Sequence, residues 1–199
     1  MTEATPTSRA LALIARGLTL SRLALLPPFL WLMYVVATSP SLPHRVAIAG
    51  CYGFIASSDA LDGRLARRAR AATQRWARLD AAADILFNLS ALAMASILGW
   101  MGPWVPAGVA LLGGRFLWRI VGDTGHSPPR VREDRAGKAA GVLYYALVGW
   151  VVIELSTGGV LGRRVLGLGA DAVFVYTLLV LWVGRESSSS GGRRITKST

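Results

Sequence analysis

The residues with the clearest chemical potential are four aspartates that fall within one short window, Asp59, Asp62, Asp80 and Asp84. Their spacings of three and four place each pair on one face of a helix. Four uncompensated carboxylates beside apolar segments would repel one another and would be costly to desolvate. A divalent cation that prefers oxygen ligands, Mg²⁺ or Mn²⁺, would offset this charge and commonly bridges carboxylates to substrate phosphates. The structural alternative is a helix-end cluster of carboxylates that is paired with nearby arginines.

Two residues that follow Asp62 suit the binding of a phosphate. Gly63 leaves a bare backbone position that a phosphate could approach closely. Arg67, one helical turn further on, offers the planar fork of donors that matches phosphate oxygens. The window therefore combines candidate metal ligands with a candidate anion clamp.

The elements that carry these residues are expected to be membrane helices. The chain has 199 residues, of which 53% are hydrophobic and 17% charged, and its mean hydropathy is +0.44. These values are too apolar for an ordinary soluble domain. We expect an all-α, polytopic membrane bundle of about six transmembrane helices. The expected spans are residues 19–37, 45–61, 79–100, 104–121, 138–155 and 168–183.

Three regions follow from this reading of the chain. Residues 1–18 form an N-terminal amphipathic segment at the membrane interface, although they could also simply begin the first helix. Residues 19–184 form the six-helix transmembrane catalytic domain, and residues 185–199 form a disordered basic cytoplasmic tail. If the second and third spans pack side by side, the four carboxylates converge on one point.

The net charge of +11 is interpreted as a topology signal. All of the 22 lysines and arginines except Arg45, Arg163 and Arg164 lie in segments that share one side. The positive-inside rule then places both termini and the aspartate window in the cytoplasm, in a multi-pass protein of the cell (inner) membrane. The partner of this charge is the lipid bilayer and not nucleic acid, because no basic run is interleaved with aromatic residues.

The spacing of the window, D-x2-D-G-x2-A-R-x12-D-x3-D from Asp59 to Asp84, closely resembles the signature of the CDP-alcohol phosphatidyltransferase family. A second match is the stretch LTLSRLALLPPF at residues 18–29, which enters the first span with Thr19 and then Arg22, as is typical of that family. The resemblance implies an enzyme that takes a CDP-linked donor, usually CDP-diacylglycerol, and an alcohol acceptor. It would form a new phosphodiester in phospholipid biosynthesis and release CMP. A homodimer is also implied.

The resemblance also implies roles for individual residues. Asp84 would be the base that takes the proton from the acceptor hydroxyl. The metal site would comprise Asp59, Asp62 and Asp80, with Asp84 close to it. The CDP-donor site would comprise Gly63, Ala66, Arg67 and Thr19.

Basic residues in later segments predict the kind of acceptor. Arg115 and Arg119 fall inside an expected span, where charge is expensive and usually faces a cavity. Arg135 and Lys138 belong to the stretch RAGKAAG, which is similar to a basic segment at the start of the fifth span in family members. We expect these four residues to bind the phosphate of an acceptor such as glycerol 3-phosphate or an inositol phosphate.

One position departs from the family pattern. Trp76 stands where the family usually has a glycine, four residues before Asp80. A tryptophan there would fill room beside the nucleotide, so a catalytically impaired relative is an alternative. A membrane prenyltransferase, which also binds a diphosphate through metal-holding aspartates, is a second alternative, but such enzymes generally carry two aspartate-rich motifs in a larger bundle.

Overall fold

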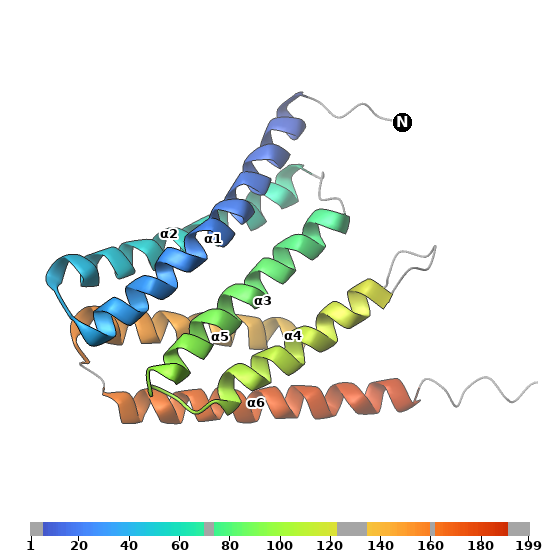
Figure 1. The fold of residues 1–199 in the computed structure, drawn as a ribbon. Helices are drawn as coiled ribbons and strands as arrows, with labels where there is room; N and C mark the ends of the chain where they lie inside the picture. Colours follow the sequence, from blue (N-terminus) through green and yellow to red (C-terminus); the bar gives the residue numbers. More distant parts are fainter. Residues whose placement is uncertain (1–5, 70–73, 123–134, 160–161, 191–199) are drawn as a thin grey trace, which may run out of the picture.

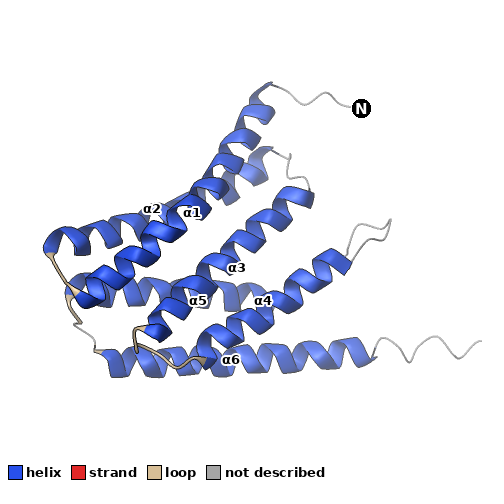
Figure 2. Cartoon of the chain, viewed as in Figure 1, coloured by secondary structure: helices blue, strands red, loops and turns tan. Residues whose placement is uncertain are grey.

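The computed structural model describes residues 6–69, 74–122, 135–159 and 162–190. In this part of the chain all regular elements are helices and none is a strand (Figure 2). The helices are α1 (Pro6–Thr38), α2 (Leu42–Ala69), α3 (Gln74–Ile97), α4 (Trp104–Gly122), α5 (Arg135–Thr157) and α6 (Arg163–Ser190). The expectation of an all-helical bundle is therefore confirmed.

Helix α1 joins the expected interfacial segment and the first span in one continuous element. It has 33 residues and is therefore about 50 Å long, well beyond the roughly 30 Å of a hydrocarbon core. Its apolar part is Gly17–Thr38. The basic residues that precede this part extend the same helix, and their position at the membrane interface stays a prediction.

Four of the helices are long and apolar enough to cross a membrane. The spans are Gly17–Thr38, Arg78–Ile97, Ala136–Thr157 and Arg163–Val183. Helices α2 and α4 are not among the spans found in the described residues. Helix α2 carries Asp59, Asp62 and several arginines, and α4 carries Arg115 and Arg119. A helical membrane bundle fits this pattern, and the number of six spans stays a prediction.

Two boundaries differ from the expected ones. The expected link between the second and third spans is largely helical, because α2 continues to Ala69 and α3 already begins at Gln74. The sequence there is rich in alanine, leucine and arginine, which favour helix even without tertiary packing. Helix α6 extends to Ser190, into the segment expected as a tail, while residues 191–199 lie outside the described part.

The helices form a closed series of neighbours in the order α1, α2, α5, α6, α4 and α3, and α5 also contacts α1 and α3. In Figure 1 the N-terminal ends of α1 and α3 and the C-terminal end of α2 lie at the same end of the bundle. This arrangement brings the segments that carry the aspartate window together with the segment that carries Thr19 and Arg22.

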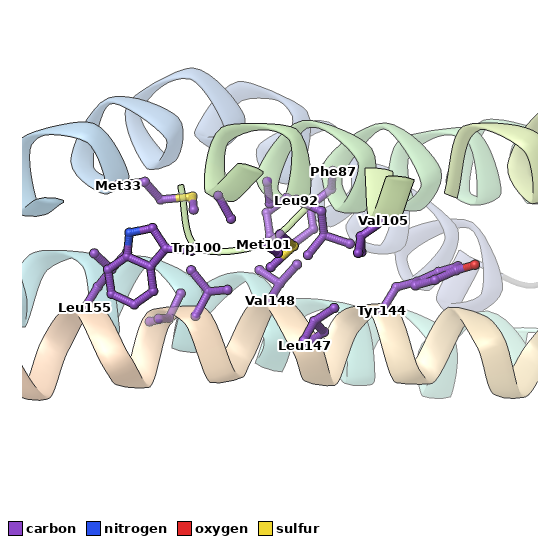
Figure 3. Packing of buried hydrophobic residues seen from close by; sticks show 14 of the residues in the cluster. Met33, Phe87, Leu92, Trp100, Met101, Val105, Tyr144, Leu147, Val148 and Leu155 are labelled. Atoms are coloured by element: carbon purple, nitrogen blue, oxygen red, sulfur yellow. The ribbon is translucent and has the colours of Figure 1, made fainter. Parts of the chain in front are cut away.

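The centre of the bundle is apolar and aromatic. Buried side chains from α1, α3, α4 and α5 interlock, among them Met33, Phe87, Val105 and Val148 (Figure 3). Phe29 lies against Phe87 with ring centroids 5.4 Å apart, and Phe87 lies 5.6 Å from the ring of Tyr145. This packing holds α1, α3 and α5 together next to the aspartates of α3.

The turns at the opposite end are set by glycine and by one cation–π contact. Helix α5 is followed by Gly158 and Gly159, whose positive φ angles of 82° and 91° are readily adopted only by glycine. Their amides donate to the carbonyl of Glu154 at 3.1 and 2.9 Å. The Arg163 guanidinium lies 4.9 Å from the centroid of the Trp100 ring, so the first residue of α6 is tied to the turn after α3.

Close packing of α3 against α4 predicts different effects for two adjacent glycines. A Cβ on Gly113 would lie 2.6 Å from Cγ2 of Ile85, whereas a Cβ on Gly114 would meet nothing within 4 Å. Gly113→Ala should lower the melting temperature in detergent, because overpacking costs about 1–3 kcal/mol and exceeds the helix-propensity gain of about 1 kcal/mol. Gly114→Ala should keep or raise it. A Gly113→Ala protein as stable as Gly114→Ala would contradict this packing.

Candidate active site

Two polar residues of α1 are buried where that helix packs on α3. Thr19 and Arg22 are three residues apart and share a face of the helix, and they are only 5% and 1% exposed. The Thr19 hydroxyl donates a hydrogen bond to Oδ1 of Asp80 at 3.0 Å. Thr19 therefore fixes one carboxylate of the window from the neighbouring helix.

The Arg22 guanidinium is the positive partner of the same carboxylates. Its Nη1 is paired with Oδ1 of Asp84 and lies 4.0 Å from Oδ1 of Asp80. The arginine side chain is 1% exposed, whereas the side chains of Asp80 and Asp84 are 40% and 37% exposed. The cation thus lies on the buried side of the pair, and each carboxylate keeps an accessible side.

The next turn of α3 continues this polar face toward the centre of the bundle. Asn88 lies four residues beyond Asp84, is 5% exposed, and donates from Nδ2 to the backbone carbonyl of Asp84 at 2.9 Å. Its Oδ1 is buried and finds no hydrogen-bond partner among the residues that the structure describes. Exposure therefore falls along the series Asp80, Asp84 and Asn88.

The predicted residues on α2 are placed by their backbone only. Asp59, Asp62, Gly63, Ala66 and Arg67 all lie in the C-terminal half of α2, and their side chains lie outside the described ones. That end of α2 is at the same end of the bundle as the start of α3 (Figure 1). Convergence of all four aspartates stays a prediction.

The carboxylate ligands at this end of the bundle suit a hard divalent cation. Asp80 and Asp84 present oxygen ligands from one face of α3, and part of each carboxylate is accessible. Among the side chains that the structure describes, no group of three or more histidine, cysteine or acidic residues gathers at one point. That Asp59 and Asp62 complete a metal site with the two carboxylates of α3 stays a prediction.

The residues expected to bind the acceptor phosphate lie on α4 and α5. Nη1 of Arg115 donates to the backbone carbonyl of Leu181 at 2.9 Å, which links α4 to α6. Lys138 is exposed in the first turn of α5. The side chains of Arg119 and Arg135 lie outside the described ones, as does that of Trp76, whose backbone belongs to the first turn of α3.

Two features of the site did not emerge from the sequence. The motif at the start of the first span includes Arg22 without indicating its partner, and no motif in the sequence includes Asn88. An arginine three residues after Thr19 at the entrance of an apolar span was a signal, because a charge there requires a buried partner. The spacing Asp80, Asp84, Asn88 was a second one, since residues four apart share a helix face.

A comparison of the chain with models of known protein families gives a match. The model of the family "CDP-alcohol phosphatidyltransferase" matches residues 12–186, which include Thr19, Arg22 and all four aspartates. No curated protein and no solved structure gives a significant match.

The match covers most of the chain, and the protein belongs to the CDP-alcohol phosphatidyltransferase family. It is accordingly a membrane transferase of phospholipid biosynthesis, in a family that pairs a lipid-type CDP donor with an alcohol acceptor and generally depends on a divalent metal. This assignment disfavours the prenyltransferase alternative.

Because a buried cation is paired with an accessible carboxylate, the effects of substituting Arg22 and Asp84 on the free energy of unfolding should be non-additive. Asp84→Leu leaves the guanidinium without its nearest carboxylate and should cost about 1–3 kcal/mol, less than for a fully buried pair because Asp84 is partly hydrated. Adding Arg22→Met should restore part of this loss, which is measurable as a higher melting temperature in the double variant.

The matched control combines Arg22→Met with Asp171→Leu, which removes an exposed carboxylate that accepts a hydrogen bond from Trp104. These two changes are expected to be additive, since the residues share no partner. Additive losses for Arg22→Met and Asp84→Leu as well would mean that the two side chains do not form a pair.

Proposed function

We propose that this protein transfers a phosphatidyl group from CDP-diacylglycerol to a phosphorylated alcohol, such as glycerol 3-phosphate or an inositol phosphate, and releases CMP. The observation that supports this most is the placement of Asp84, a partly exposed carboxylate fixed from behind by Arg22, within the segment that the family model matches. A carboxylate held in this way can accept a proton from a bound hydroxyl on its accessible side.

The reaction then proceeds by one substitution at phosphorus. The acceptor hydroxyl gives its proton to Asp84, and its oxygen forms a bond to the phosphorus that bears the diacylglycerol group. The bond from that phosphorus to the oxygen of CMP breaks, and CMP leaves with the electron pair. The role of Arg22 is to orient Asp84 and to keep it from turning toward the apolar core.

Residues of α2 and α3 would hold the divalent cation. The ligand set is Asp59, Asp62 and Asp80, with Asp84 beside it, and its all-oxygen character suits Mg²⁺ or Mn²⁺. When bound, the cation supplies positive charge that stabilises the diphosphate and the departing CMP.

The CDP donor would bind along α2 and the start of α1. Gly63 and Ala66 leave room for the diphosphate, and Arg67 supplies donors to its oxygens. The hydroxyl hydrogen of Thr19 is already directed to Asp80. Thr19 is therefore expected to accept a hydrogen bond from the donor nucleotide rather than to give one.

The acceptor phosphate would bind to the cations of α4 and α5, namely Arg115, Arg119, Arg135 and Lys138. Nη1 of Arg115 also donates to the carbonyl of Leu181, so this residue joins α4 to α6 close to the proposed anion site. We also propose a homodimer in the inner membrane, with both termini and the active site in the cytoplasm.

The direct test is release of CMP from CDP-diacylglycerol by the purified protein in detergent with Mg²⁺ or Mn²⁺. The acceptor panel contains glycerol 3-phosphate, inositol phosphate, inositol, serine and glycerol. We expect release with one of the phosphorylated acceptors and its loss on addition of EDTA. Release only with an unphosphorylated alcohol would refute the proposed acceptor class, and its absence with every acceptor would refute the reaction.

The assignment of the base is tested with Asp84→Asn, which is nearly isosteric but cannot take up the proton. Turnover should fall by about 10²–10⁴-fold, the usual contribution of a general base. Asp171→Asn, a change at an exposed carboxylate of α6, should leave turnover intact and serves as the control. Full activity of a folded Asp84→Asn protein would remove Asp84 from this role.

The tryptophan that replaces the family glycine gives a further test. If the enzyme is active with Trp76, then Trp76→Gly should alter the KM for CDP-diacylglycerol and leave the KM for the acceptor unchanged, because the change affects room beside the nucleotide. Turnover that appears only in Trp76→Gly would instead identify the natural protein as a catalytically impaired relative.

A further inference from the structure

The side-chain amide oxygen of Asn88, Oδ1, is a hydrogen-bond acceptor one helical turn from the proposed base. The orientation of the amide is fixed, because Nδ2 faces the carbonyl oxygen of Asp84 at 2.9 Å, and exchanging the amide nitrogen and oxygen would bring two acceptors together. Oδ1 is therefore the other branch of the amide, and among the residues that the structure describes it is buried without a hydrogen-bond partner. A buried acceptor left in this way destabilises the fold, so the position suits a donor other than the described side chains, such as a bound ligand.

The position of this atom limits what the donor can be. Side chains on a helix lean toward its N-terminus, and the hydrogen bond to the backbone carbonyl of Asp84 keeps the amide of Asn88 turned toward the N-terminal part of α3, which carries the carboxylates. Residues that surround it on α3, Phe87 and Ala91, are buried and have apolar side chains without donors. Oδ1 thus belongs to the polar face of α3, at the end of that face which borders the apolar core.

A metal ion is a poor occupant of this position. The guanidinium of Arg22 is buried on the same face and is paired with Asp84, one turn from Asn88. A second cation there would face this fixed positive charge at short range in a medium of low dielectric constant. A neutral donor, such as a hydroxyl group, satisfies the same oxygen without that repulsion.

We propose that Asn88 is a specificity-determining residue, whose Oδ1 accepts a hydrogen bond from a second hydroxyl of the acceptor alcohol while Asp84 acts on the first. This inference rests on the proposed function. The proposed acceptor is a polyol phosphate in which the carbon next to the one bearing the attacking hydroxyl also carries a hydroxyl. An alcohol with a single hydroxyl leaves Oδ1 buried and unpaired, and the site rejects it for that reason.

The test compares two acceptors that differ by one hydroxyl, glycerol 3-phosphate and 3-hydroxypropyl phosphate. If an inositol phosphate is the acceptor that supports CMP release, it is compared instead with its deoxy analogue, which lacks the hydroxyl next to the one that attacks phosphorus. In the natural protein, loss of the hydroxyl should lower kcat/KM by about 10–100-fold. In Asn88→Leu the two acceptors should react with nearly equal kcat/KM.

Thr177→Val is the matched control, because it removes a buried hydrogen bond between α6 and Tyr144 of α5 at a distance from the aspartates in the sequence. It should preserve the ratio between the two acceptors even if it lowers stability. A ratio in Asn88→Leu equal to that of the natural protein would overturn the inference and leave the proposed function standing. Absence of CMP release with every acceptor would refute the proposed function itself.

A second measurement does not depend on the folding of any variant. The melting temperature of the natural protein in detergent is recorded with each of the two acceptors at the same concentration. Glycerol 3-phosphate, or the inositol phosphate in its place, should raise it more than the analogue that lacks the hydroxyl, because bound ligand stabilises the folded state according to its affinity. Equal shifts would overturn the role of Asn88.

Discussion

The buried guanidinium of Arg22 is the constraint on which the site depends. A cation that is 1% exposed in an apolar bundle is tolerated only with a carboxylate in contact, because the cost of removing it from water is several kcal/mol. Asp84 provides that contact, and Asp80 lies beside it. Since the arginine is on α1 and the aspartates are on α3, this single requirement fixes how the two helices face each other.

The same pairing explains how a hydrophobic membrane protein can keep acidic residues at the proposed active site. Arg22 neutralises part of the repulsion from the buried side, and Thr19 directs one further hydrogen bond to Asp80. The accessible sides of both carboxylates are where the proposed cation and substrate would bind. Beyond them the polar face of α3 ends at Asn88 and the aromatic layer of Phe29 and Phe87 begins, so the proposed site lies at one end of the bundle.

Much of this could be predicted from the sequence, and the reasons are local. Membrane helices are long apolar runs, so the class of fold followed from composition and length, and the aspartate spacing indicated both the helix faces and the family. The boundaries near Ala69 and Gln74 were missed because charged helix formers look like a loop when only hydropathy is considered. The partners of Arg22 were missed because a contact between residues 22 and 84 depends on tertiary packing, which spacing along one helix does not report.

The most direct test of this account is the register between α1 and α3, measured by cross-linking. Cys51 is the one cysteine of the chain, so Cys51→Ala gives a background without thiols. Thr19→Cys is combined with Asp80→Cys or, as a control, with Ala91→Cys, which lies about 16 Å further along α3. A protease site inserted between α2 and α3 then reports whether a short thiol-reactive linker has joined the two fragments. The account predicts joining with Asp80→Cys and none with Ala91→Cys, whereas joining with Ala91→Cys alone, or with neither, would contradict it.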